Sequence, residues 1–264
     1  MRKFGFVMLA LVLALGMAFV SCGDGDGNNN TPGDNGGGSG NSGYRIATMK
    51  GYYIPLERLN STIYYRYRSD NFLDKTEYFD GNGVQQSTTT NFYNASSWLV
   101  RTESVQHATG NLVVTEYEYE VSENLVRTTT TSTTSTGVTG SISEETFSGG
   151  KQTGARSYSL DGTTLLSTAT YSDGKAIEGR IYNPDGSLNA VTTFSYNSSG
   201  RPEAQTTSYP SIGQITVLTY TYDSDGRLDF TTTSINGEPS TRTEYTYERG
   251  IGRTGRPRPD GTVP

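Results

Sequence analysis

The stretch TYTYDSDGRLDFTTTSING, residues 219–237, alternates, turns, alternates again and then turns a second time. Tyr220 and Tyr222 are two residues apart, so both side chains lie on one face of an extended strand. Asp223 and Gly226 supply turn chemistry, because an Asp side chain caps backbone N–H groups and Gly readily takes a positive φ. The residues after the turn alternate again and include β-branched threonines, which favour strands. The stretch therefore predicts a β-hairpin.

The same pattern of an aromatic followed by a turn recurs along the chain. Taking the second aromatic of each unit as its anchor, successive anchors are 11 to 14 residues apart, or 25 to 28 where one unit is less marked. The anchors are Tyr67, Phe79, Tyr93, Tyr119, Phe147, Tyr158, Tyr171, Tyr182, Tyr196, Tyr222 and Tyr247. A strand of about 5 residues and a loop of about 4 nearly fill a period of roughly 12–13 residues and leave no room for helices. The repeat predicts an all-β antiparallel meander of about 14 to 18 strands, forming an elongated or curled sheet.

Composition agrees with thin sheets and excludes several classes of protein. The chain has 19 Tyr and 9 Phe, although hydrophobic residues are only 32% of it. Tyr buries a large ring while its hydroxyl reaches water or a partner, which suits a sheet with half-wet faces. The formal charge of −6 disfavours binding to nucleic acid, which wants a basic surface. One Cys and one His allow neither an internal disulfide nor a Cys/His metal cluster.

The turn motif resembles that of a known family. YDSDGRL at 222–228 is similar to the YD repeat of Rhs-type bacterial proteins and teneurins. The matching residues are Tyr222, Asp223, Gly226, Arg227 and Leu228, with partial matches at Tyr196 and Gly200 and at Tyr182, Asn183, Gly186 and Leu188. The resemblance covers most of residues 60–250, and we expect the β-repeat domain to span residues 44–250. Large Rhs proteins coil this sheet into a shell around a C-terminal toxin. For this chain we expect the repeat fold but not the function of enclosing a toxin.

The N-terminal segment has the pattern of a bacterial lipoprotein. Residues 1–21 begin with Arg2 and Lys3 and continue as an apolar run, which is typical of a signal peptide. FVSC, ending at Cys22, resembles the lipobox, in which the Cys is lipidated and becomes the new N-terminus. Residues 22–43 are rich in Gly, Asn and Asp and predict a flexible tether. The expected partner at this end is a membrane, bound through the N-terminal lipid.

The residue after the Cys and the other end of the chain refine this localisation. Gly23 stands where, in the resembled family, an Asp favours inner-membrane retention, so we expect an outer-membrane lipoprotein. Surface exposure and the periplasmic face are both open alternatives. Residues 251–264 carry Arg253, Arg256 and Arg258 among Gly and Pro, which predicts a disordered basic tail.

A search for catalytic and metal-binding patterns yields none. His107 precedes a turn and lacks a recognisable nucleophile partner. Glu116, Glu118 and Glu120 alternate with tyrosines and predict a charged strand face. The aspartates of the turns are too few and too closely spaced for an EF-hand loop. We expect no catalytic residue, no metal and no cofactor.

The sequence favours a non-enzymatic binding protein. Tyrosine is enriched at recognition surfaces, and the predicted binding face consists of Tyr117, Tyr119, Tyr220, Tyr222, Tyr245 and Tyr247. The expected partners are a glycan or a surface protein, and not nucleic acid. The alternative is a structural or assembly subunit of the envelope that has no small ligand. A polysaccharide-active enzyme is the least favoured hypothesis.

Overall fold

A computed structural model describes residues 44–54 and 56–249, all of whose regular elements are strands. The predicted signal peptide, lipidation site, tether and basic tail lie outside the described residues. Sixteen strands follow one another: β1 Tyr44–Tyr53, β2 Arg58–Tyr67, β3 Leu73–Asp80, β4 Gln85–Tyr93, β5 Leu99–Gln106, β6 Leu112–Ser122, β7 Leu125–Thr134, β8 Gly137–Ser148, β9 Lys151–Ser159, β10 Leu165–Ser172, β11 Lys175–Tyr182, β12 Leu188–Tyr196, β13 Pro202–Tyr209, β14 Gln214–Tyr222, β15 Leu228–Ile235 and β16 Glu238–Arg249.

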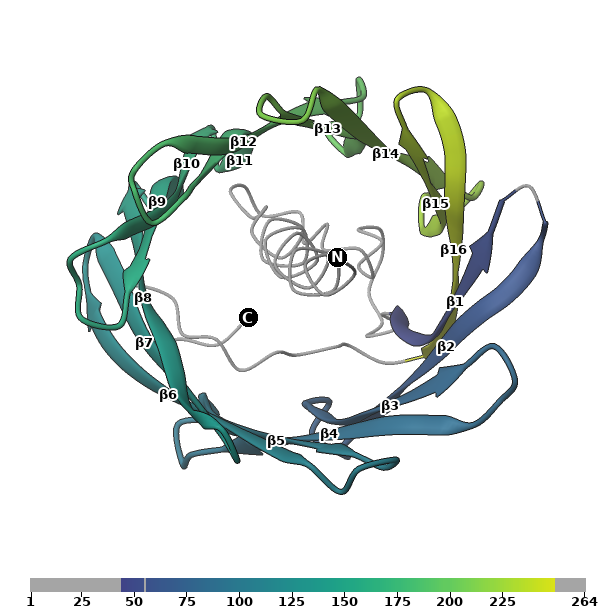
Figure 1. Ribbon diagram of the computed structural model, residues 1–264, viewed down its shortest axis with the longest axis horizontal. Coiled ribbons are helices and arrows are strands. Elements are labelled where there is room, and N and C mark those ends of the chain that lie inside the picture. The colour runs from purple at the N-terminus through teal and green to yellow at the C-terminus, as the bar shows by residue number, and fades with distance from the viewer. Residues whose placement is uncertain (1–43, 55, 250–264) are drawn as a thin grey trace, which may run out of the picture.

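The sheet is closed, which corrects the expectation of an elongated or curled sheet. Each strand pairs antiparallel with its neighbours in sequence, and β1 also pairs with β16, from Tyr44 opposite Arg249 to Tyr53 opposite Thr241. Figure 1 shows the resulting ring of strands viewed end on. An antiparallel meander of 16 strands is thus confirmed, while its closure depends on pairing between residues about 200 positions apart. Closure satisfies the backbone groups that an open sheet leaves unpaired at its two edges.

Bulges beside the aromatic anchors help to bend the strands. Thr221 lies opposite Phe230, whereas the next residue, Tyr222, lies opposite Leu228, so Asp229 is an extra residue on β15. The same one-residue shift comes directly before the last aromatic of β2, β4 and β12. Such bulges increase local twist and are common at the rims of barrels.

The meander gives the barrel two different ends. Connections that follow β2, β4 and the other even-numbered strands lie at one end, and those that follow odd-numbered strands lie at the other. Each even-numbered strand has one aromatic anchor in its last few residues: Tyr67, Tyr93, Tyr119, Phe147, Tyr171, Tyr196, Tyr222 and Tyr247. We call this end of the barrel the tyrosine end. The structural repeat is therefore a pair of strands of 24 to 28 residues, made of two of the predicted units.

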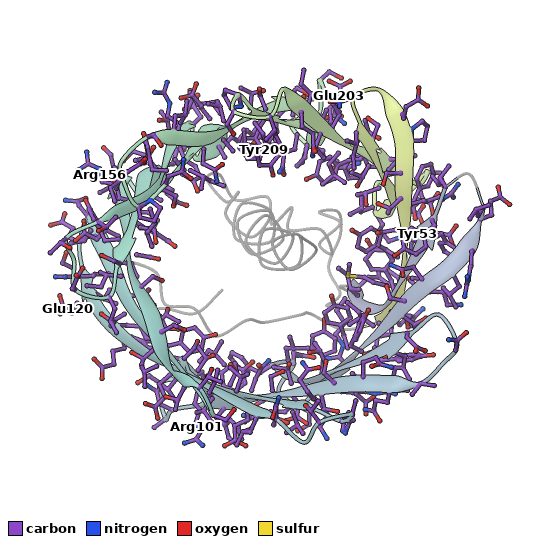
Figure 2. All side chains as sticks on the ribbon, viewed as in Figure 1. Tyr53, Arg101, Glu120, Arg156, Glu203 and Tyr209 are labelled. Carbon is purple, nitrogen blue, oxygen red and sulfur yellow. The ribbon has the colours of Figure 1, made fainter. Side chains whose placement is uncertain are left out.

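The wall is one sheet thick, and burial is correspondingly shallow. No large side chain is fully buried among the described residues. Several of the buried residues are small, such as Ala169, Ala176 and Ala190. A closed barrel of sixteen strands is too wide for its own side chains to fill. In Figure 2 the described side chains line the two faces of the wall without meeting across the middle.

Candidate functional site

The register separates the inner and outer faces of the wall, because residues directly opposite each other on paired strands share a face. Tyr209 points into the barrel, whereas Arg101, Glu120, Arg156 and Glu203 point outward (Figure 2). Following the pairs from these labelled residues around the ring assigns the remaining side chains to one face or the other.

The inner face carries a cluster of tyrosines from four alternate strands. Thr207 shares the inner face with Tyr209 and pairs with Thr216, which places Tyr220 and Tyr222 of β14 on the same face. Tyr220 pairs with Thr231, and the register continues to β16 and β2. We define the inner tyrosine cluster as Tyr65, Tyr67, Tyr196, Tyr220, Tyr222, Tyr245 and Tyr247.

The strands between these tyrosines carry smaller inward side chains. Thr207 of β13 and Thr231 and Leu228 of β15 are all buried, although the wall has no second layer. The tyrosines of the flanking even-numbered strands are large enough to lean over these residues and shield them from water. The cluster thus serves in place of the core that a wide barrel cannot form.

Five of the aromatic anchors make the same hydrogen bond. At the end of an even-numbered strand, the Tyr hydroxyl donates to the first or second carbonyl of the preceding odd-numbered strand. The pairs are Tyr93 to Leu73, Tyr119 to Leu99, Tyr196 to Ala176, Tyr222 to Pro202 and Tyr247 to Leu228, with oxygen–oxygen distances of 2.6 to 2.8 Å. This bond ties the two strands of each structural repeat together at the tyrosine end.

Cations lie over several of the same rings. The guanidinium of Arg201 is 5.6 Å from the centre of the Tyr222 ring, and the ammonium of Lys175 is 5.5 Å from that of Tyr196. Arg227, the Arg of the YD-like motif, is 6.0 Å from the centre of the Tyr247 ring. Each cation comes from the connection before the odd-numbered strand of the same structural repeat, or from the first residue of that strand.

The motif residues of the sequence shape these turns. Asp223 accepts backbone N–H bonds from Asp225 and Arg227 through one carboxylate oxygen, and a bond from the Arg227 guanidinium through the other. Asn197 and Asn183 occupy the corresponding position in two further turns, where the N–H groups of Gly200 and Gly186 donate to their carbonyls. Gly186, Gly200 and Gly226 have φ between 75° and 80°, a conformation that favours glycine.

Burial changes the chemistry of the inner tyrosines. Loss of solvent raises the pKa of Tyr67, Tyr93 and Tyr222 to about 12, and raises the pKa of Tyr65, Tyr220 and Tyr247 as well. Their hydroxyls therefore stay protonated at physiological pH. They act as neutral hydrogen-bond donors.

The six tyrosines of the predicted binding face do not form one site. Tyr220, Tyr222, Tyr245 and Tyr247 lie together in the inner tyrosine cluster, on β14 and β16. Tyr117 and Tyr119 are also on the inner face, but on β6, at another part of the ring. The hydroxyls of Tyr119, Tyr222 and Tyr247 are already bonded to backbone carbonyls.

Sequence reasoning did not assign several other inner-face tyrosines to the binding face, among them Tyr53, Tyr78 and Tyr209. Tyr53 and Tyr78 lie on the inner face of β1 and β3 and are 48% and 36% exposed, and Tyr209 also points inward. All three are near the end of the barrel opposite the tyrosine end. Only the strand pairing reveals that these residues share a face, since they belong to three different strands.

The outer face carries a row of charges across neighbouring strands. Glu120 lies opposite Arg127, Arg127 opposite Glu144, and Glu144 opposite Arg156. Arg127 approaches Glu120 to 3.8 Å and Glu144 to 3.9 Å. Similar pairs join Arg66 to Glu77 and Arg242 to Glu244 elsewhere on this face.

This charged row makes part of the outer face strongly polar. The predicted charged face of Glu116, Glu118 and Glu120 is part of this outer surface. The part of the chain described by the structure contains no helix long and apolar enough to cross a bilayer.

The described residues offer little for catalysis or metal binding. The ring nitrogen Nε2 of His107 is 2.9 Å from the Thr88 hydroxyl, an exposed contact beside a turn. Within 44–54 and 56–249, no three His, Cys, Asp or Glu side chains gather as potential metal ligands.

Comparison with known proteins leaves the family open. No family model and no curated protein matches the chain. Among solved structures, a porin-like protein from Bacteroides uniformis is 14% identical, with a TM-score of 0.29, covering 77% of this chain and 96% of that one. A porin-like protein from Bacteroides vulgatus is 9% identical, with a TM-score of 0.39, covering 77% and 98%.

A third similar structure is a toxin complex. TcdB2-TccC3 without its hypervariable C-terminal region is 10% identical, with a TM-score of 0.30, covering 72% of this chain and 18% of that one. At these identities and scores, the three structures assign neither a membrane position nor an activity to this chain.

Proposed function

We propose that this chain is a non-enzymatic, lipid-anchored envelope protein that binds a glycan along the inner face of its barrel. The observation that carries the proposal is the tyrosine lining of that face, which includes the accessible rings of Tyr53 and Tyr78. A concave wall with aromatic planes and a few placed polar groups is the usual form of a binding site.

The chemistry of the inner face suits a sugar polymer. Tyr rings offer flat surfaces on which sugar rings stack, and their protonated hydroxyls donate hydrogen bonds. Inward threonines and serines that are not fully buried add hydroxyl groups, as at Thr115 and Ser132, whose hydroxyls are 2.9 Å apart. A protein partner is the other outcome that the experiment below distinguishes.

The envelope localisation rests on the lipobox-like FVSC and on the polar segment that follows Cys22. Two or more acyl chains on Cys22 would hold the barrel at a membrane. This placement agrees with the charged outer face, since the barrel then stands in water beside the membrane.

For the alternative of an assembly subunit, pairing between edge strands is not available in the described sheet. An open sheet would join its neighbours by pairing at edge strands. Here β1 and β16 pair with each other, so the described sheet has no free edge. Assembly would have to use another surface.

Glycan-array binding, followed by titration calorimetry with the best ligand, tests the proposal. The protein begins at residue 22 and carries Cys22→Ala, which keeps the barrel, tether and tail. We expect Tyr53→Ala with Tyr78→Ala to weaken binding at least tenfold. Phe92→Ala is the matched control, because Phe92 is 40% exposed on the outer face, and it should leave the affinity unchanged.

Three outcomes decide between the alternatives. Failure of the folded parent protein to bind any glycan would overturn the glycan proposal. Equal loss of affinity in the inner and outer variants would remove the inner face as the site. Capture of a protein that Tyr53→Ala with Tyr78→Ala releases, in the absence of glycan binding, would reassign the inner face to a protein partner.

A further inference from the structure

The two ends of the barrel differ in a way that neither the fold nor the proposed glycan site requires. Every connection that follows an odd-numbered strand has an exposed large apolar residue in it or within two residues of it. Four of them, Leu56, Val84, Val138 and Ile212, are 57% to 77% exposed. Leu56, Val84 and Ile212 lie in the β1–β2, β3–β4 and β13–β14 connections. Val138 is the second residue of β8, close to the β7–β8 connection.

The remaining four connections complete the ring. Leu112, Leu160, Leu188 and Ile235 are all exposed, beside or within the β5–β6, β9–β10, β11–β12 and β15–β16 connections. We call these eight residues the apolar rim. The tyrosine end has no such ring, since Phe92 and Ile177 are its two exposed large apolar residues in the described chain.

We infer that the apolar rim docks on a lipid surface whose headgroups are zwitterionic. Such docking goes beyond the proposed function, and the predicted lipid anchor only brings the barrel near a bilayer. Exposed apolar side chains at one end of a water-facing wall cost free energy unless a partner covers them.

The arrangement of the rim favours a bilayer over a protein. Its members are separate side chains among Gly, Asn, Ser and Thr, distributed over all eight connections around the barrel, with Tyr53 and Ile215 as further exposed residues beside two of them. A protein partner needs a packed, continuous apolar centre with shape complementarity. A bilayer interface is flat and fluid, so it accepts separate side chains at eight positions at once, and the binding strength follows the buried apolar area.

The charge of the rim selects the headgroup. The connections of this end carry Glu57, Asp80, Asp161, Asp185 and Glu238 against one cation, Arg58, an excess of four negative charges. Anionic lipids attract basic segments and repel acidic ones. A headgroup without net charge therefore fits this end better.

The predicted anchor makes a bilayer available. β1 begins 22 residues after Cys22, at the tyrosine end. A chain of 22 residues spans up to roughly 70 Å when extended, at about 3.3 Å per residue. A strand of ten residues spans about 33 Å. The tether is therefore long enough to let the opposite end of the barrel face the membrane that holds the lipid.

Vesicle flotation tests the inference with the chain from residue 22 carrying Cys22→Ala, so that neither acyl chains nor residues 1–21 supply lipid binding. The test variant combines Leu56→Ser, Val84→Ser, Val138→Ser and Ile212→Ser. The matched control combines Phe92→Ser and Ile177→Ser, exposed apolar residues at the other end. We expect the parent and the control to float with phosphatidylcholine vesicles. The test variant should lose at least tenfold in partitioning.

Other readouts keep the test decisive. Circular dichroism and thermal unfolding establish that both variants fold, and glycan binding by the test variant should match the parent, which separates this inference from the proposed function. Phosphatidylglycerol should reduce partitioning of the parent. Absence of flotation in the parent, or equal flotation of the test variant, would overturn the inference. A doubled mass in sedimentation that only the test variant abolishes would assign the rim to a second copy of the chain instead.

Discussion

The hydroxyl of Tyr222, at the end of β14, donates a hydrogen bond of 2.8 Å to the carbonyl oxygen of Pro202, at the start of β13. The bond crosses 20 residues of sequence and closes one structural repeat. Four further repeats make the same bond, so this contact is a unit of the scaffold. The aromatic anchor thus has a mechanical role whether or not it also faces a ligand.

Removing this hydroxyl should destabilise the barrel measurably. We expect Tyr222→Phe to lower the free energy of unfolding by about 1 kcal/mol, because the Pro202 carbonyl loses its donor while the ring stays in place. Urea unfolding followed by circular dichroism measures the change. Tyr53→Phe is the control, since that residue is half-exposed, and it should change stability by less than about 0.5 kcal/mol. Equal effects of the two substitutions would contradict the structural role of the bond.

Gly226 should be less tolerant of a side chain than a glycine with the same backbone conformation elsewhere. A Cβ at Gly226 would lie 2.1 to 2.4 Å from the guanidinium atoms of Arg201, whereas a Cβ at Gly237 would meet nothing within 4 Å. Both glycines have positive φ, 78° and 87°. Gly237→Ala therefore reports backbone strain alone, about 1 kcal/mol. Gly226→Ala should cost about 0.5–1 kcal/mol more, because Arg201 must leave the Tyr222 ring.

A double substitution separates the two causes. In an Arg201→Ala background, the extra cost of Gly226→Ala over Gly237→Ala should disappear, since no guanidinium remains to be displaced. Chemical denaturation of Gly226→Ala and Gly237→Ala, each with and without Arg201→Ala, gives this comparison. An extra cost that persists without Arg201 would show that the clash is not its source.

The buried tyrosines predict a loss of stability at alkaline pH. The pKa of Tyr67, Tyr93 and Tyr222 is raised to about 12 in the folded chain, above the ordinary value of 10.0. The folded state keeps these protons after the unfolded state has lost them, so their stabilisation is complete below about pH 10 and is lost as the pH rises towards 12. We expect the urea midpoint to fall in this window, less steeply in Tyr222→Phe. A midpoint unchanged up to pH 12 would contradict the burial of these hydroxyls.

Lipidation at Cys22 is a prediction from sequence alone. We expect Cys22→Ala to move the protein from the membrane fraction to the soluble fraction, and labelled palmitate to be incorporated only in the parent. Protease treatment of intact cells then distinguishes surface exposure from the periplasmic face. Continued palmitate incorporation by Cys22→Ala would place the lipid elsewhere.

Local features were predictable because they depend on residues close in sequence. The alternation around Tyr220 and Tyr222 predicted a strand, and Asp223 and Gly226 predicted the turn that the structure contains. The repeat predicted an antiparallel meander with about the observed number of strands. In each case the physical cause, a side-chain period of two or a positive φ, acts within a few residues.

The face occupied by each aromatic was not predictable in the same way. Tyr222 and Phe79 are both anchors of the sequence repeat, yet Tyr222 points into the barrel, while Phe79 is on the outer face and meets the edge of Tyr64 at 5.4 Å. Their strands run in opposite directions, and only the register around the ring fixes which side is inside. The apolar rim escaped notice for a similar reason, since its members lie far apart in sequence.

By itself, the sequence determined the strands, the turns, their repetition and the expectation of an N-terminal lipid anchor, because hydrophobic periodicity and turn chemistry are local. Only the tertiary structure decided that the sheet closes, since closure depends on β1 meeting β16 with a register that satisfies both edges. Closure in turn created an inner face, an outer face and two unlike ends. These differences, which carry the proposed functions, exist only once distant strands are held in one ring.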